Sequence, residues 1–450
     1  MSPTLQKSIK FFPLTMIAVG ACIGSGIFMA PSDVAAQLGT GYEILAVWLI
    51  GGVVALTGAL SFGELASRFP GTGGVYLYLR EAYGDLVAFL YGWCILTVIT
   101  SGALAGLCLV FAGYLCVVLQ LGNDAQIPVA VVELAIVTLI SIFGVKFSSL
   151  FSSTLTVIKI AGIALVVVVA LFYGQHLIPN VTIRTHETQT VSFGIALIGV
   201  LWSYGGWHHA SYLGGEVINA QKVMPKAFFA GALLVTIIYM AVNVGYLSLL
   251  RLDQIASSEA VAADALMQVT AAGGMLIAIL IALSTFGTAS IYTLSAPRIY
   301  YTMGADKVFF PWLSDIHTKF GTPAKAVLLQ SVWAVILLIF WGTFESIATY
   351  VVFMDWIFMT LAAIALFIFR KRNPVSSDSG YKTPLYPVTP LIFIGISVWF
   401  LISTLIGRPI QTIAGLSLMV IGLPVYFYFK QSQEKSSTPR PPSKGEDDRA

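Results

Sequence analysis

Apolar residues fill this chain in long runs that are separated by short polar connections. A run of about 17–25 apolar residues is long enough to cross the hydrocarbon core of a bilayer as a helix. The pattern predicts twelve spans, over residues 14–37, 43–67, 86–118, 128–144, 150–173, 191–217, 226–250, 272–300, 324–342, 346–370, 386–406 and 410–430. Residues 1–13 form a short amino-terminal segment, and the polar, proline-rich residues 431–450 are expected to be disordered.

The composition places the chain in the membrane class. Hydrophobic residues make up 57% of it and charged residues only 10%, whereas soluble domains carry about 25% charged residues. The chain is therefore expected to be an all-α polytopic membrane protein whose immediate partner is the lipid bilayer. Nucleic acid is not expected as a partner, because the basic residues lie in short loops and not in one patch.

The cysteines and histidines indicate neither a disulfide framework nor a metal site. All four cysteines, Cys22, Cys94, Cys108 and Cys116, lie within apolar runs. There is no C-x-x-C pair and no Cys/His spacing typical of metal ligands. We therefore expect no metal and no cofactor.

The distribution of Lys and Arg predicts the orientation in the membrane. Cytoplasmic loops carry an excess of these residues. With the amino terminus inside, all but four of the 24 Lys and Arg residues lie on the cytoplasmic side, and both termini are cytoplasmic. The exceptions are Arg184, Arg251 and Arg408, which face outward, and Lys159, which lies within a span.

Glycines interrupt the first and sixth spans at matched positions. Gly24-Ser25-Gly26 lies inside the first span, and Gly205-Gly206 lies inside the sixth. A glycine inside a helix costs about 1 kcal/mol relative to alanine, and a break in lipid is tolerated only where the freed backbone groups face protein, water or ligand. These glycines could instead be helix-packing positions.

Two matched breaks favour a LeuT-like fold with a 5+5 inverted repeat. Discontinuous helices at corresponding positions of two halves indicate an inverted-repeat transporter with a site at mid-membrane. The first repeat would cover residues 14–173 and the second 191–370, with two further helices over 386–430.

The polarity of the broken ends predicts what such a site binds. The half-helix that begins near Gly24, Ser25 and Gly26 directs free N–H groups and a positive dipole end toward an anion. The halves that end at Cys22-Ile23 and at Trp202–Gly205 direct free carbonyls toward a cation. This pair of sites matches the carboxylate and ammonium of an α-amino acid, although other zwitterions fit the same polarity.

Lys159 lies near the middle of the fifth span, about 14 Å from either end at the helical rise of 1.5 Å per residue. A central lysine marks function by default. It could be a structural cation in the place of a coupling sodium ion, a titrating proton carrier, or a group facing a water-filled vestibule. Tyr239 in the seventh span is a candidate polar neighbour, and Asp355 in the tenth is a second deep charge that could line the pathway or be structural.

At these residues the chain resembles the amino acid–polyamine–organocation superfamily, and within it the L-type amino-acid transporter family and its bacterial relatives. Five motifs carry the resemblance: IGSGIF from Ile23, ALSFGELASRFPGTGGVYLYLREAYG from Ala59, YGGWHHASYLGGEVINAQKVMPKA from Tyr204, STFGTASIYTLSAPRIYY from Ser284 and MDWIFMTLAAIALFIFRKR from Met354.

The resemblance implies roles for individual residues. Substrate carboxylate would be bound by the N–H groups of Gly24, Ser25 and Gly26, and the ammonium by carbonyls at Cys22, Trp202 and Gly205. Trp202 would be the aromatic gate, commonly Phe, and its larger indole would favour small side chains. Lys159 would replace a sodium site. Further candidates for the pathway are Ser203, Tyr204, His208, Thr285 and Asp355.

The chain also departs from the animal members. They join a glycoprotein partner through a cysteine between the third and fourth spans, and the loop Leu119–Pro128 has none here. His208 and Asp355 each stand where an Asn is usual in those members, and a titratable acid at Asp355 could support proton movement.

The leading hypothesis is a sodium-independent carrier of neutral, small L-amino acids in the plasma membrane, a bacterial inner membrane, exchanging substrates by alternating access. The alternative is a proton-coupled symporter of the same fold, with Lys159 or Asp355 titrating. An enzyme is disfavoured because adjacent His208-His209 point about 100° apart on a helix and no acid/base, nucleophile or metal set converges.

Overall fold

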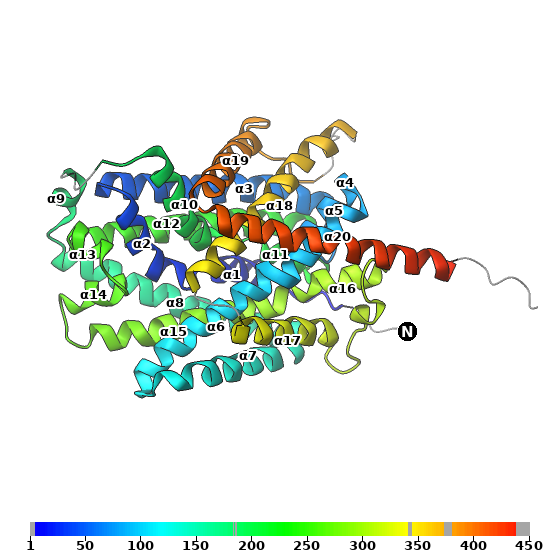
Figure 1. The fold of residues 1–450 in the computed structure, drawn as a ribbon, viewed down its shortest axis with the longest axis horizontal. Helices are drawn as coiled ribbons and strands as arrows, with labels where there is room; N and C mark the ends of the chain where they lie inside the picture. The colour runs from blue at the N-terminus through cyan, green and yellow to red at the C-terminus, as the bar shows by residue number, and fades with distance from the viewer. Residues whose placement is uncertain (1–4, 183, 185–186, 341–343, 373–379, 438–450) are drawn as a thin grey trace, which may run out of the picture.

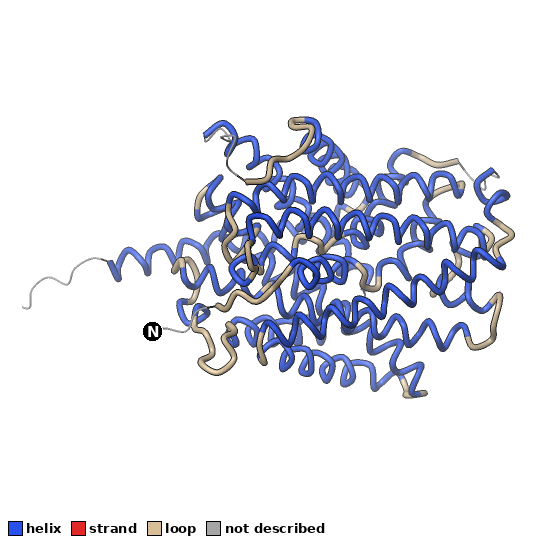
Figure 2. The backbone as a smooth tube through the Cα atoms, turned by 180° about the vertical axis from the view of Figure 1, so that it is seen from behind, coloured by secondary structure: helices blue, strands red, loops and turns tan. Residues whose placement is uncertain are grey.

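The computed structural model describes residues 5–182, 184, 187–340, 344–372 and 380–437. Helices make up most of this part of the chain, and the single extended pairing in it is an isolated bridge between Ile9 and Val217. The long helices run side by side between two ends of the molecule, where loops join them (Figure 2). Helix α20 leaves the bundle on the same side as the amino-terminal segment (Figure 1), as expected for termini on one side of a membrane.

The helices follow the predicted apolar runs, several of which are divided. The longer ones are α1 (Phe11–Cys22), α2 (Gly26–Gln37), α3 (Gly41–Arg68), α4 (Val75–Tyr83), α5 (Asp85–Cys94), α6 (Thr100–Leu119), α7 (Gln126–Ile142), α8 (Val145–Tyr173), α10 (Thr190–Tyr204), α12 (Ala220–Leu249), α15 (Gly273–Ser295), α16 (Pro297–Ala305), α17 (Ala324–Phe340), α18 (Phe344–Arg372), α19 (Val388–Gly407) and α20 (Pro409–Ser437). Short helices are α9 (Leu177–Thr182), α11 (His209–Tyr212), α13 (Leu252–Ala256) and α14 (Val261–Met267).

Ten of the helical runs in the described residues are long and apolar enough to cross a membrane. The two other predicted spans correspond to shorter apolar helices, Val191–Tyr204 and Ala324–Phe340. The sixth run is shortened because its helix stops at Tyr204, before the glycine pair. The predicted twelve spans are reached only if these two shorter helices are counted together with the ten long ones.

The carboxyl-terminal end differs from the expectation of a disordered tail from residue 431. Helix α20 continues to Ser437, because Lys430, Gln431, Gln433 and Glu434 are good helix formers even in a polar segment. The rest of the predicted tail, 438–450, lies outside the described residues. The repeat boundaries at 14–173 and 191–370 stay predictions.

The core lies where α3 and α12 pack along each other beside the broken helices. Trp48 of α3 meets the rings of Tyr204 and Tyr239 at centroid distances of 6.0 and 5.5 Å. Gly52 lets α3 approach α12 closely, because a Cβ there would overlap the Thr236 side chain. This aromatic and glycine contact fixes the ends of the break in α10 against the scaffold.

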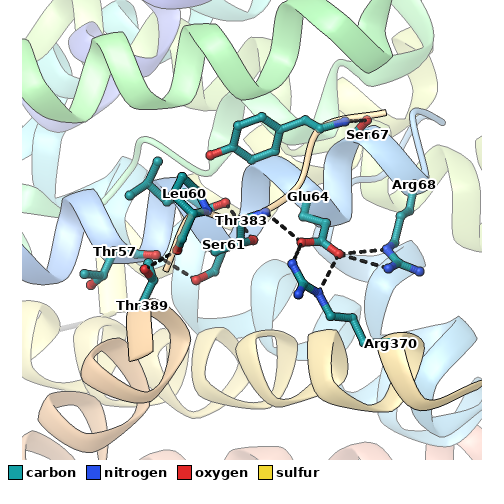
Figure 3. A network of polar contacts seen from close by, with 11 residues as sticks. Thr57, Leu60, Ser61, Glu64, Ser67, Arg68, Arg370, Thr383 and Thr389 are labelled. Carbon is teal, nitrogen blue, oxygen red and sulfur yellow. Dashed lines mark hydrogen bonds and ion pairs between the residues drawn. The ribbon is translucent and has the colours of Figure 1, made fainter. Parts of the chain in front are cut away.

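A buried ion network ties α3 to α18 and to the segment before α19. Glu64 of α3 receives hydrogen bonds from Arg68 Nη2 at 2.9 Å, from Arg370 Nε at 3.0 Å and from the Thr383 N–H at 2.8 Å (Figure 3). The Glu64 side chain is fully buried. A buried carboxylate needs such partners, so this network holds the relative positions of three segments that are far apart in sequence.

Candidate functional site

The first break separates α1 from α2. Helix α1 ends at Cys22 and α2 begins at Gly26, with Ile23, Gly24 and Ser25 between them. The Gly24 N–H donates to the Cys22 carbonyl at 2.9 Å. Within the described part of the chain, no acceptor faces the N–H groups of Ser25, Gly26 and Ile27. The free donors thus sit one residue further along than the sequence predicts, since Gly24 is already engaged.

The second break follows α10. The Gly205 N–H closes the last turn on the Leu201 carbonyl at 2.8 Å. Gly206 then adopts φ of +112°, a backbone conformation that glycine reaches without steric cost. A Cβ at Gly206 would overlap the Ala21 backbone. The turn therefore lies directly against the end of α1, and the two predicted breaks face each other.

One tyrosine hydroxyl connects the two broken ends. Tyr239 Oη lies 2.9 Å from the Cys22 carbonyl and 2.9 Å from the Ser203 carbonyl. The Cys22 thiol adds a contact of 3.4 Å to the Tyr204 carbonyl. The Tyr239 hydroxyl has one proton and donates it to one of these carbonyls at a time. The Cys22 carbonyl also accepts from the Gly24 N–H at 2.9 Å, so it has a lone pair for a ligand when Tyr239 donates to the Ser203 carbonyl. Sequence reasoning paired Tyr239 with Lys159, but in the described structure its hydroxyl bonds the breaks instead.

Lys159 of α8 binds the back of the first break. Its ammonium is fully buried and lies 3.0 Å from the Gly20 carbonyl, 2.5 Å from the Ile23 carbonyl, 3.1 Å from the Ser284 carbonyl and 2.9 Å from Thr288 Oγ1. These are neutral oxygens from α1, from the break after it and from α15, and such oxygens are the ligands that a hard cation prefers.

The Ile23 carbonyl belongs to this cation site and not to the substrate side. It accepts from Ser284 Oγ at 3.1 Å and from Thr288 Oγ1 at 2.9 Å as well as from Lys159. These three donors occupy its acceptor positions. The sequence-based assignment of Ile23 to a substrate ammonium therefore does not fit this geometry, which leaves Cys22, Trp202 and Gly205.

Two cavities meet at Trp202. The larger has a volume of 490 Å³, is lined by Gly26, Asp33 and Arg408 among others, and has Trp202 in its wall. The smaller has a volume of 30 Å³ and lies between Trp202, Gly205, His208 and Asp355. We call the larger cavity the vestibule and the smaller one the inner cavity. The inner cavity is contracted, and Trp202 stands between it and the vestibule.

The inner cavity has a polar wall. His208 Nε2 lies 3.5 Å from Asp355 Oδ2, which is longer than a hydrogen bond, and both side chains are buried. Among the described residues, Asp355 Oδ1 has no hydrogen-bond partner. Next to them, His209 stacks on Tyr292 at 4.0 Å and contacts Ser295 Oγ at 2.8 Å.

The other pathway candidates have side chains with partners of their own. Ser203 and Thr285 donate to carbonyls of their own helices, at Gly199 (2.8 Å) and Ile281 (2.9 Å). Tyr204 packs in the aromatic core. Sequence reasoning missed Ser284 and Thr288 as partners of Lys159. Their spacing of four residues places both on one face of an apolar helix, and this pattern could have predicted a polar contact.

The fold and the site together define the class of membrane protein to which this chain belongs. Two broken helices that face each other inside a bundle of apolar spans, with a gate residue between two cavities, are the features of a multi-pass membrane transporter of the LeuT fold. Residues 9–427 match the family model described as amino acid permease. The chain belongs to this family, and it is a transporter of a small-molecule substrate and not an enzyme.

Individual relatives are similar over almost the whole chain. The serine/threonine exchanger SteT of Bacillus subtilis (strain 168) is 33% identical over 95% of this chain and 98% of its own length. The b(0,+)-type amino acid transporter 1 of Rattus norvegicus is 30% identical over 95% of this chain and 88% of its own. The human cystine/glutamate transporter is 27% identical over 94% and 85%.

Proposed function

We propose that this protein exchanges small neutral L-amino acids across a membrane, independently of sodium, by alternating access. The observation that carries the proposal is the facing pair of breaks, with free N–H groups at Ser25, Gly26 and Ile27 and the Cys22 carbonyl beside them. Free N–H groups at a helix start bind anions, and carbonyls bind cations. The site therefore suits the two charges common to all α-amino acids.

Sodium independence is supported by the contacts of Lys159. The carbonyls and hydroxyls around its ammonium are the ligands that a sodium ion would need, and the lysine, unlike an ion, is covalently attached. The Lys159 side chain therefore stays at the site in every cycle. Exchange of serine and threonine by the relative SteT supports both the mode of transport and small substrates.

The position of Trp202 supports the size limit. Its indole stands in the walls of both cavities, so it must move for substrate to pass from the vestibule to the breaks. A bulky indole leaves less room than a phenyl ring, and small side chains such as those of alanine, serine and threonine fit best.

The test uses purified protein in liposomes loaded with one amino acid. We expect uptake of labelled L-serine to require internal amino acid and to be equal in sodium and choline buffers. A panel of competing L-amino acids should rank small neutral ones first. Stimulation by sodium, or no uptake of any amino acid, would contradict the proposal.

A proton-coupled symporter is the second candidate, and the contact between His208 and Asp355 favours it. Two titratable groups at 3.5 Å in the wall of the inner cavity could carry one proton with the substrate. Uptake into empty vesicles driven by an alkaline interior, abolished by Asp355→Asn, would identify symport. Exchange that survives Asp355→Asn without a pH response would exclude it.

We also place the protein in the plasma membrane, as in a bacterial inner membrane, with both termini in the cytoplasm and without a disulfide-linked partner. The distribution of Lys and Arg supports the orientation. All four cysteines are buried and unpaired, and none lies in the loop Leu119–Pro128. Protease accessibility of a tag at either end, in oriented membrane vesicles, tests this placement.

A further inference from the structure

Exposed lysines gather where the amino-terminal segment pairs with the chain after α11. They are Lys7, Lys10, Lys222 and Lys226. The first two flank Ile9, whose carbonyl accepts a hydrogen bond from the Ile218 N–H at 2.9 Å. The other two lie in the first two turns of α12, which begins two residues after Ile218. This pairing brings the two lysine-bearing segments next to each other, and we call the four lysines the basic patch.

The charge of the basic patch is not balanced by acidic groups. Among the residues that the structure describes, none of its lysines forms an ion pair. Glu216, in the segment before α12, is bound to Arg298. Glu64 of α3, the helix that packs along α12, is bound to Arg370. Both carboxylates are fully buried, so the lysines leave an uncompensated positive charge on this surface.

The exposed face of α12 changes from basic to apolar within one turn. Its two lysines are followed at the same helical spacing by apolar residues that are 41%, 38% and 57% exposed: Phe229, Leu233 and Ile237. Residues three or four apart lie on one face of a helix. A face on which lysines give way to apolar side chains fits the boundary between the headgroups and the hydrocarbon of a bilayer.

Helix α1 shows the same change at a similar depth. Lys10 is followed by Phe11 and Phe12, which are 44% and 57% exposed. The two helices start at the same end and lie close together, because a Cβ on Gly231 of α12 would come within 3.0 Å of the Ala18 side chain. At 1.5 Å per residue, the start of α1 lies about 10.5 Å before this contact and the lysines of α12 about 7.5–13.5 Å before it.

We propose that the basic patch binds an anionic phospholipid, whose phosphate contacts the lysines and whose acyl chains lie along the exposed apolar residues of α1 and α12. Lysine binds phosphate as a point charge, and clusters of four or more basic residues beside a membrane-spanning helix attract anionic lipids. The bound lipid joins the amino-terminal segment to α12 across the pairing of Ile9 with Ile218. This inference rests on the proposed orientation, which places the patch in the cytoplasmic leaflet.

The test titrates the purified protein in neutral detergent with short-chain phosphatidylglycerol and follows the melting temperature, which a ligand of the folded state raises. The patch variant combines Lys222→Gln with Lys226→Gln. The matched control combines Lys146→Gln with Lys371→Gln, which removes two exposed lysines at the start of α8 and the end of α18. Each lysine near anionic lipid contributes about 1 kcal/mol, or about fivefold in affinity. We expect the half-saturating lipid concentration to rise about five- to thirtyfold in the patch variant and to stay unchanged in the control.

Two further ligands separate the possible sources of the phosphate. Glycerol phosphate has the anionic group without acyl chains, and short-chain phosphatidylcholine has the chains with a neutral headgroup. Both should stabilise the protein far less than phosphatidylglycerol. Equal stabilisation by glycerol phosphate would show a site for free phosphate, and equal stabilisation by phosphatidylcholine would show an apolar site that ignores the lysines. Either result overturns the proposal.

The lysine variants decide where the lipid binds. No stabilisation of the wild type, an unchanged affinity in the patch variant, or an equal loss in the patch variant and the control would exclude the basic patch as the site. If the patch variant does not fold, Lys7→Gln combined with Lys10→Gln tests the patch from the amino-terminal segment. The binding measurement needs no transport of amino acids, so its result stands whether or not the proposed exchange is found.

Discussion

At the scale of residues, the lysine in the fifth span determines how the first break is held. The Lys159 ammonium contacts the Gly20 carbonyl of α1, the Ile23 carbonyl of the break, and the Ser284 and Thr288 oxygens of α15. Without a donor, buried carbonyls at a helix end cost about 1–3 kcal/mol each. The break in α1 is thus stable because a cation from another helix satisfies it.

Lys159→Ala should therefore reduce the rate of exchange at least about tenfold. Leaving even one buried carbonyl without a hydrogen-bond donor costs a free energy that corresponds to a factor of this size. The matched control is Lys146→Ala, which removes an exposed lysine from the same helix and should leave exchange unchanged. Initial rates of serine exchange in liposomes give the comparison. Full activity in Lys159→Ala would show that the break needs no internal cation.

Tyr239→Phe removes a single hydroxyl and leaves the ring against Trp48 and Tyr204. We expect exchange to fall about tenfold, because the Cys22 and Ser203 carbonyls lose a shared donor worth about 1 kcal/mol or more. The melting temperature should change by only a few degrees. Tyr173→Phe, at the exposed end of α8, serves as the control in the same transport and melting measurements. Equal rates in both variants would separate Tyr239 from the mechanism.

At the scale of elements, Gly206 makes the turn from α10 to α11 possible. Gly206 has φ of +112° and lies on the Ala21 backbone. In Gly206→Ala, the conformational strain alone is about 1–3 kcal/mol, and the added Cβ pushes the two breaks apart. Exchange should be lost and the melting temperature lowered. Gly395→Ala in α19 adds a Cβ into open space and should be neutral in both measurements.

The elements were largely predictable from the sequence, and the contacts at the breaks were not. Glycines inside apolar runs identified both interruptions, because glycine weakens a helix wherever it stands. The direction of each carbonyl depends on side chains from α8, α12 and α15, which no local pattern encodes. For this reason the sequence predicts a substrate contact at Ile23 although its carbonyl faces Lys159, and a free donor at Gly24 although its N–H bonds the Cys22 carbonyl.

At the scale of the whole molecule, the vestibule is open while the opposite end is closed. There the amino-terminal segment pairs with the chain after α11, with the Ile9 N–H 3.0 Å from the Glu216 carbonyl and the Ile218 N–H 2.9 Å from the Ile9 carbonyl. The Glu216 carboxylate binds Arg298 through two hydrogen bonds of 2.9 Å, and both side chains are fully buried. These contacts join three parts of the chain: the segment before α1, the segment after the second break, and α16. Alternating access requires these three parts to separate at this end.

Breaking this closure should open the inner end. In the closed conformation of Glu216→Gln, the Arg298 guanidinium is buried without its counter-charge, which destabilises this conformation by about 3–5 kcal/mol. A conformation in which water hydrates Arg298 avoids this cost. Cys22 at the end of α1 reports the opening, because it is 4% exposed in the closed form.

In a background with Cys94, Cys108 and Cys116 changed to alanine, maleimide should label Cys22 in inside-out vesicles faster in Glu216→Gln than in the parent. Glu81→Gln, which alters an exposed glutamate on α4, should label at the parental rate. If Glu216→Gln labels no faster, the inner closure does not depend on the ion pair, and the amino-terminal pairing must hold it alone.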